Sequence, residues 1–491
     1  MNAALLIIGL VFAVAIALGL LARRGHEMSL EQWSIGGRGF GALFVFLLMA
    51  GEIYTTFTFL GGSGWAYGKG APAFYIMCYA ALAYSGSYLL LPVIWRYAQA
   101  KRLVSQADFF VAKYDSKALG VLVSLVSVAA LVPYLVLQLK GMGIIVSEAS
   151  YGRIPPALAV WAGSAALIGY VVISGVRGSA WTAAFKDLMI LGVAVGIGVY
   201  LPFHYFGGFG AMFRAIAAEK PDFFTLPPSG MSPAWLISTV LLSAVGFYMW
   251  PHSFASTYTA RREDVFRKNA MVLPLYQLIV LFVLLTGFAA VKVVPGLAGP
   301  DADLSLLRVS RVTFGGPVLG LIGGAGLLTA LVPGSMILIT AATIVAKNIY
   351  RPMRPATSDR TVGVLARAVV PAIALLSVWL TLRGGEAIVS LLLLGYSFVT
   401  QLFPALLLSL GRRPLASAAG AFAGITAGEA TVAYLSLSGA SVASRLPWAP
   451  QMVKDLNVGI VALGVNIAVL AVVSLATRRP APVLAGDALR V

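Results

Sequence analysis

Five charged side chains stand inside long apolar stretches of this 491-residue chain: Glu52, Lys140, Lys186, Asp187 and Glu429. A charge buried in an apolar segment is costly, so each marks a candidate site for ions, protons or charged solutes. Glu52 is the clearest candidate because it follows Met49-Ala50-Gly51, whose small residues allow a helix to unwind and expose backbone carbonyl groups. Lys186 is the second, because it stands about seven residues into its apolar stretch, beside Asp187.

The remaining residues that could react or bind metals give no indication of an enzyme or a metal site. Cys78 is the single cysteine, and His26, His204 and His252 lie too far apart for a recognisable metal motif. No Ser-His-Asp set or HExxH motif is present. We therefore expect no enzyme activity, no cofactor and no resident metal beyond a transported ion.

The composition places the elements that carry these charges in a membrane. Hydrophobic residues make up 59 % and charged residues 11 % of the chain, and the mean hydropathy is +0.90. Soluble chains carry about 25 % charged residues. The net charge of +17 is spread between apolar stretches, so it reports membrane topology and not nucleic-acid binding. The fold class predicted is an all-α integral membrane protein.

Thirteen apolar stretches are long enough to span a bilayer. They cover residues 2–22, 42–62, 73–95, 118–147, 156–176, 179–202, 233–258, 269–294, 314–346, 363–382, 386–411, 416–438 and 456–477. Loops after odd-numbered spans, with the C-terminal tail, hold 22 Lys and Arg residues, and the opposite loops hold 10. This bias predicts a cell-membrane protein with its N-terminus outside and its C-terminus in the cytoplasm.

A second interruption occurs in the seventh span, at Trp250-Pro251-His252. Pro251 removes a backbone donor and breaks or kinks the helix. The interrupted spans two and seven are five apart, which is typical of two five-helix halves with a binding site at the midplane. We expect residues 42–411 to form this inverted-repeat core, preceded by one span and a loop (1–41) and followed by two peripheral spans and a tail (412–491), in one transporter domain.

Several segments resemble the sodium:solute symporter family over nearly the whole chain. They are Trp33-Ser34-Ile35-Gly36-Gly37-Arg38, residues 62–68, Val132-Pro133-Tyr134-Leu135-Val136-Leu137-Gln138 and Trp250-Pro251-His252. The resemblance implies a leucine-transporter-like fold, with spans two to eleven as the five-plus-five core. Phe185-Lys186-Asp187, residues 267–274 and 330–333, and Lys347-Asn348-Ile349-Tyr350 are most similar to the monocarboxylate permease branch.

The breaks and the family motif on span four predict a substrate cavity between spans two, four, seven and eleven. Its expected lining residues are Gly51, Tyr54, Thr55, Tyr134, Gln138, Trp250 and Gln401. Lys140, also on span four, could hold an anion or face a lipid headgroup.

The sequence departs from the family where its members bind sodium. The two hydroxyl positions of span nine fall on Val332 and Pro333, whose side chains offer no oxygen to a hard cation. The expected coupling-ion residues are Met49, Glu52, Lys186, Thr329, Val332 and Pro333; a sodium site would need Met49, Glu52, Thr329 and Ser335. Lys186 could act in place of sodium with Glu52 as its partner, or extend towards the cytoplasm beside Asp187.

These observations predict a secondary active symporter for a small organic solute, a monocarboxylate such as lactate or pyruvate, coupled to H+ or Na+. Membrane lipid is the other expected partner. Two alternatives remain open at this point. One is a sodium-coupled, proline-like amino-acid symporter, and the other is a transporter-like membrane sensor.

Overall fold

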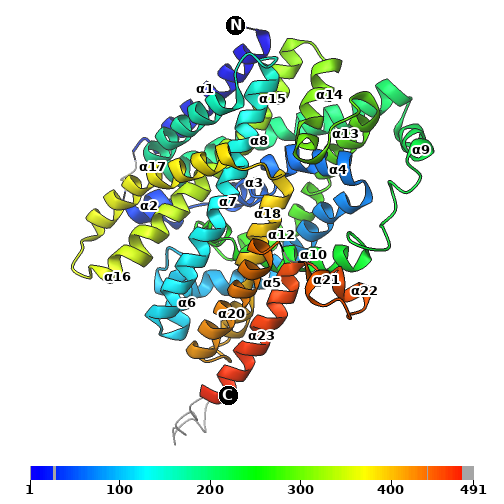
Figure 1. The fold of residues 1–491 in the computed structure, drawn as a ribbon. Helices are drawn as coiled ribbons and strands as arrows, with labels where there is room; N and C mark the ends of the chain where they lie inside the picture. Colours follow the sequence, from blue (N-terminus) through cyan, green and yellow to red (C-terminus); the bar gives the residue numbers. More distant parts are fainter. Residues whose placement is uncertain (1, 26–28, 440, 478–491) are drawn as a thin grey trace, which may run out of the picture.

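The chain folds into helices joined by short loops (Figure 1). The computed structural model describes residues 2–25, 29–439 and 441–477, and these residues contain no strand. The longer helices are α1 (Ala3–Arg23), α3 (Ala42–Gly51), α5 (Tyr75–Lys101), α7 (Lys117–Ala149), α8 (Pro156–Phe206), α10 (Pro233–Gly246), α12 (Asp264–Tyr276), α13 (Ile279–Val293), α15 (Gly316–Ile344), α17 (Asp359–Arg383), α18 (Ile388–Val399), α20 (Ala418–Leu437) and α23 (Val458–Thr477).

Shorter helices complete breaks or cover the ends of the bundle. They are α2 (Leu30–Ile35), α4 (Ser63–Lys69), α6 (Gln106–Tyr114), α9 (Phe209–Glu219), α11 (Pro251–Tyr258), α14 (Ser305–Thr313), α16 (Arg351–Met353), α19 (Phe403–Ser409), α21 (Val442–Arg445) and α22 (Gln451–Lys454). Tighter or wider helical turns are η1 (Gly36–Arg38), η2 (Phe57–Gly62), η3 (Ala71–Phe74), η4 (Phe247–Met249), η5 (Gly299–Leu304), η6 (Val345–Tyr350) and η7 (Thr400–Leu402).

Nine helical segments of the described chain are long and apolar enough to cross a membrane, or ten if one bent pair counts as a single span. The expected count was thirteen. The three further spans expected from the sequence fall on the short pair α3–α4, on α20 and on the second half of α8. The thirteen-span topology therefore stays a prediction.

One expected loop is absent, because the fifth and sixth expected spans run on as the single helix α8. Its only non-helical residue is Gly175, with φ +60° and ψ −164°. A Cβ at this position would lie 2.8 Å from the Trp33 ring and 2.9 Å from the Trp33 carbonyl oxygen. Glycine alone fits both the backbone conformation and the space. The turn that we expected at residues 177–178 thus lies at the single residue Gly175.

The core is centred on α15, whose apolar segment is 94 % buried, while the segments of α1 and α23 are 28 % buried. α15 packs against α1, α7, α8 and α17. The last two long helices, α20 and α23, pack mainly on each other. Gly420 and Gly424 allow this close approach, since a Cβ on either would meet α23 backbone within 3 Å.

Candidate functional site

Glu52 lies in a helix break. α3 ends at Gly51, and a turn and the wide helical turn η2 precede α4, which begins at Ser63. The whole segment from Leu47 to Tyr67 is buried. Wide turns of this kind leave backbone groups out of the regular helical pattern. The break therefore brings carbonyl groups and a carboxylate into the middle of the bundle.

Threonine hydroxyls hold the turn of this first break. The Thr58 hydroxyl donates to the carbonyl groups of Ile53 (2.7 Å) and Thr55 (3.0 Å). The Thr55 hydroxyl accepts from the amide of Phe57 (3.1 Å). Both side chains thus bond to the backbone at the break, and the Thr55 hydroxyl, an expected substrate contact, is used structurally.

Lys186 reaches the first break from α8. It stands eleven residues beyond Gly175, about 16 Å at the helical rise, and its side chain is 0 % exposed. Its Nζ lies 3.3 Å from the carbonyl oxygen of Tyr54 and 2.9 Å from Oδ1 of Asp187. A Cβ on Gly51 would lie 3.1 Å from the same Nζ. An ammonium group is therefore inserted into the break, and the glycine leaves room for it.

Each of the two alternatives for Lys186 agrees with the structure in part. The side chain does not extend to the cytoplasm, because it is wholly buried. Its ion-pair partner is Asp187, and no ion pair with Glu52 is present among the described residues. The physical reason is that the Glu52 carboxylate lies towards the second break instead.

Glu52 connects the two breaks. Its Oε2 accepts a short hydrogen bond from the hydroxyl of Ser253 on α11, and its backbone carbonyl accepts from Tyr134 on α7 (3.3 Å). Its Oε1 is buried and has no hydrogen-bond partner in the described chain. A carboxyl group with one unpaired oxygen in an apolar interior is suited to holding a proton.

Three of the residues expected to hold sodium already have hydrogen-bond partners in the described chain. The Thr329 hydroxyl donates to the Gly326 carbonyl (2.6 Å) on its own helix. The Ser335 hydroxyl donates to the Val332 carbonyl (2.6 Å) and lies 2.7 Å from the Ser179 hydroxyl. The carbonyl of Met49 accepts from Tyr84 (3.0 Å).

At this break the residues present do not fit a sodium ion. Val332 lies beside the break, with Cγ1 3.9 Å from where a Gly51 Cβ would be, and both it and Pro333 offer only carbon side chains. Lys186 already brings a positive charge to the Tyr54 carbonyl. A second cation beside an ammonium group would be repelled.

The second break lies between α10 and α11. The chain leaves α10 through η4, becomes extended at Trp250 (φ −59°, ψ 127°), and starts α11 at Pro251, with a bend of 48°. Proline suits this first helical position because a backbone N–H there would have no partner within the helix, so its absence costs nothing. The bend points Trp250 towards α7.

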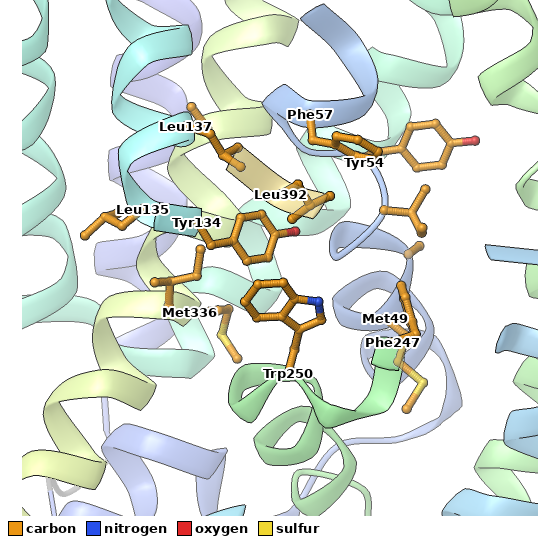
Figure 2. Packing of buried hydrophobic residues seen from close by; sticks show 14 of the residues in the cluster. Met49, Tyr54, Phe57, Tyr134, Leu135, Leu137, Phe247, Trp250, Met336 and Leu392 are labelled. Carbon is orange, nitrogen blue, oxygen red and sulfur yellow. The ribbon is translucent and has the colours of Figure 1, made fainter. Parts of the chain in front are cut away.

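Aromatic rings surround this second break. The Trp250 ring lies 4.7 Å from the Tyr134 ring and 5.4 Å from the Tyr396 ring, measured between centroids. Tyr396 also packs against Tyr79 (5.6 Å), and His252 packs against Tyr134 (5.3 Å). Figure 2 shows Tyr134 and Trp250 facing each other, with Met336 and Leu392 beside them. The side chains packed around the second break are thus mostly aromatic.

Two nitrogen donors in this region are unused. Gln138 stands one turn after Tyr134 on α7, and its Oε1 accepts from the hydroxyl (2.7 Å) and the amide of Thr56. The Nε2 of Gln138 and the Nε1 of Trp250 are buried without a hydrogen-bond partner in the described chain. Buried donors normally find acceptors, so this pair is available to an anionic or carbonyl-bearing ligand.

Two expected lining residues do not join this cluster. The Tyr54 hydroxyl donates to the Tyr276 carbonyl of α12 (2.7 Å), and Figure 2 shows its ring directed away from Tyr134 and Trp250. The Gln401 amide donates to the Gly459 carbonyl of α23 (3.2 Å), which ties the core to the last helix. Both side chains are therefore hydrogen-bonded to backbone outside this cluster.

Sequence reasoning missed four residues of the site. Ser253 stands two residues after Pro251, so the break itself could have indicated it. Tyr79, Tyr84 and Tyr396 reach the site only through the packing of their helices. No local sequence motif indicated them.

Lys140 neither points to the proposed substrate site nor faces a lipid headgroup; it forms an ion pair within the protein. Its Nζ lies 3.0 Å from Oδ2 of Asp303 and 2.8 Å from the Glu386 carbonyl, and the same Asp303 oxygen accepts from the Ile388 amide (3.0 Å). One carboxylate thus ties α7, η5 and the start of α18 together. Beside this contact lies a cavity of about 510 Å³ lined by α4, η5 and the residues before and in α18.

With this geometry established, comparisons with known proteins decide the family. The sequence model of the sodium:solute symporter family matches residues 33–428. The chain belongs to the sodium:solute symporter family. An uncharacterized symporter, YhjB of Bacillus subtilis (strain 168), is 59 % identical over 479 residues, covering 98 % of each chain. A monocarboxylate transport permease protein of Rhizobium johnstonii is 28 % identical and covers 96 % of this chain and 97 % of its own.

The fold of this symporter is also found in solved structures. A Na+-coupled sialic acid symporter in a substrate-bound, outward-open state superposes with a TM-score of 0.80, at 16 % identity, over 97 % of this chain and 98 % of its own. The family prediction is confirmed, and the fold is that of leucine-transporter-like transporters. The protein is an integral membrane symporter of a small molecule.

Proposed function

We propose that this symporter couples the uptake of a small monocarboxylate, such as lactate or pyruvate, to protons by alternating access. The observation that carries the proposal is the buried ammonium group of Lys186 at the first break. This ammonium group is a permanent positive charge at the place where a sodium-coupled relative would bind a sodium ion for part of its cycle. The coupling ion would then be a proton carried by a titratable group. Glu52, between the two breaks, is our candidate for that group.

Glu52 is the proposed proton carrier. It takes a proton from outside water, which neutralises its carboxylate and makes burial inexpensive. The carboxylate substrate then binds, the outer side closes, and both leave on the inner side, where water again stabilises the charged carboxylate. One proton and one anion move in each cycle, and the Lys186–Asp187 pair remains in place.

The proposed substrate site lies among Tyr134, Trp250 and Tyr396. The unpaired donors Trp250 Nε1 and Gln138 Nε2 hold the substrate carboxylate, and the amide groups at the start of α11 add a favourable dipole. The aromatic side chains would contact the short apolar body of the substrate. The 28 % identical monocarboxylate transport permease supports this substrate class.

The remaining topology belongs to the same proposal. Thirteen spans result if α3–α4 and α10–α11 each cross once, if α8 crosses twice at Gly175, and if α20 also crosses. Spans two to eleven then form the inverted-repeat core. In Figure 1, α1 begins and α23 ends at opposite ends of the molecule, which supports an odd number of crossings.

The test is uptake by the purified protein in liposomes. Labelled lactate, pyruvate, alanine and proline are offered under a proton gradient without sodium, or under a sodium gradient at equal pH. We expect accumulation of lactate or pyruvate in the first condition. Sodium-driven accumulation of proline or alanine alone would contradict the proposal and favour an amino-acid symporter, and binding without transport would favour a sensor.

A further inference from the structure

A basic pocket of about 480 Å³ lies where α5, α6, α7 and η6 meet. Its lining residues include five basic side chains and, within the described chain, a single acid, Asp108: the basic residues are Lys101, Arg102, Lys117, Lys347 and Arg351. Leu103, Val111 and Ala112 form an apolar part of the wall. Nothing in the transport cycle proposed above uses this pocket.

The acid in the pocket is already occupied. The Asp108 carboxylate accepts from the amides of Val104 (3.0 Å) and Ser105 (3.1 Å), from Lys347 Nζ (2.6 Å) and from Asn348 Nδ2 (2.8 Å). Burial acts to raise the pKa of Asp108, but Lys347 and these donors hold it below its usual value. Asp108 and Lys347 therefore neutralise each other and form the floor of the pocket.

Of the other basic side chains, Arg351 pairs with Asp359 (2.8 Å), and the remaining three are left largely free. In the described chain no ion pair is formed by Lys101 or Lys117. Arg102 lies 3.8 Å from Glu31 and its side chain is 79 % exposed, so that contact is weak. The pocket thus presents an unbalanced positive charge in a concave wall.

The pocket lies at one end of the membrane-crossing helices. Lys101 ends α5, Lys117 begins α7, and η6 ends at Tyr350. Figure 1 shows α6 and α16 at the lower left, on the side opposite α9. The positive-inside bias assigns this end to the cytoplasm, where anionic lipid headgroups are within reach of basic side chains.

We infer that this pocket binds a phosphate group at the inner membrane surface. The phosphate of an anionic phospholipid matches the position at the helix ends, the cationic rim and the apolar wall, while free phosphate matches the rim alone. Such a ligand would bridge α5, α7 and η6, which come from three different spans.

The test uses the full-length protein in detergent, with phosphatidylglycerol, phosphatidylcholine or inorganic phosphate added separately. Bound lipid is counted by native mass spectrometry, and phosphate binding is followed by calorimetry. The variant is Lys101→Gln/Lys117→Gln. The matched control is Arg412→Gln/Arg413→Gln, which removes two exposed charges from the loop after α19, outside the pocket.

We expect phosphatidylglycerol to bind the wild type and the control, and to bind the pocket variant about thirtyfold more weakly, since each basic residue contributes about fivefold near an anionic lipid. Lys101→Arg/Lys117→Arg should restore binding, which separates charge loss from misfolding. Binding of inorganic phosphate with the same variant dependence and no lipid preference would support the site with a soluble source. Equal loss in pocket variant and control, or no binding of either probe, would overturn the inference.

Discussion

The two helix breaks occupy similar places in the fold but differ in how their polar groups are satisfied. At the first break, the hydroxyls of Thr55 and Thr58 and the ammonium group of Lys186 bond to the backbone. At the second break, Trp250 Nε1 and His252 Nδ1 are buried without partners in the described chain. Glu52 spans the two, with its backbone in the first and its carboxylate on Ser253 of the second.

This difference separates two tasks. A break whose groups are satisfied by an internal cation has no need of a bound ion to remain stable. A break with unpaired donors gains free energy when a ligand supplies the acceptors. The first break is thus suited to fixing the electrostatics of coupling, and the second to recognising a substrate.

The largest effect is expected from Lys186→Met. Removing the ammonium leaves the Asp187 carboxylate buried and unpaired, which costs about 3–5 kcal/mol of stability. Thermal unfolding of the purified protein should show the loss. The double variant Lys186→Met/Asp187→Asn should recover most of the stability but not substrate accumulation. If the double variant accumulates substrate normally, the ammonium is only structural.

Glu52→Gln should abolish accumulation driven by a pH gradient, because the amide cannot carry a proton. Exchange of labelled for unlabelled substrate should persist, since the side-chain volume is kept. Glu429→Gln on α20 is the matched control, and it should leave both activities unchanged. Retained proton-driven accumulation in Glu52→Gln would assign the proton to another group.

Trp250→Phe tests the second break, because it keeps an aromatic ring and removes the indole donor. A hydrogen bond to a charged group contributes about 1.5–3 kcal/mol, so the KM for a carboxylate substrate should rise by roughly 10- to 100-fold. Trp235→Phe, whose ring stacks on Trp65 beside the cavity near Asp303, is the control. An unchanged KM in Trp250→Phe would remove this donor from the substrate site.

Asp303→Asn should have a moderate effect, because it weakens the contact that ties η5 to α7 and α18. A cysteine at Ser390, which lines the cavity beside Asp303, then reports access to that cavity through its alkylation rate. Cys78→Ser provides the background, since Cys78 is exposed. The rate should rise about threefold, as a partly exposed ion pair contributes up to ~1 kcal/mol. A slower or unchanged rate would show that the contact does not restrict access to this cavity.

The smallest effect is expected from Ser335→Ala. The Ser335 hydroxyl bonds to its own helix and to Ser179, so its loss should change initial uptake less than about twofold, by a net hydrogen-bond contribution well below that of a charged group. Loss of uptake with a strong dependence on sodium concentration would instead indicate a cation ligand.

The sequence predicted the places of the breaks better than the directions of the side chains. Gly51 acts locally by leaving space for a neighbouring side chain, and Pro251 acts locally because it lacks a backbone donor. Both effects can therefore be predicted from the sequence. The rotation of each helix about its axis is set by packing. For this reason Gln401 faces α23 instead of the aromatic cluster, and Glu52 contacts Ser253 instead of Lys186.

The distances between helices could not be predicted from the sequence either. The single residue Gly175 turns α8 where a loop was expected, because the close approach of Trp33 excludes a side chain there. Lys140 meets Asp303 across more than 160 residues of chain, and neither position indicates the other. The burial of Lys186 was one of two alternatives that its depth in an apolar stretch allowed.

The central claim, that Lys186 replaces the sodium ion and leaves coupling to a proton, is tested most directly by measuring proton movement. The purified protein is placed in sodium-free liposomes containing a pH-sensitive dye, and lactate or pyruvate is added outside. Wild-type protein should acidify the lumen as substrate enters, and Lys186→Met/Asp187→Asn should not. Substrate entry that requires sodium and produces no acidification in the wild type would contradict the claim.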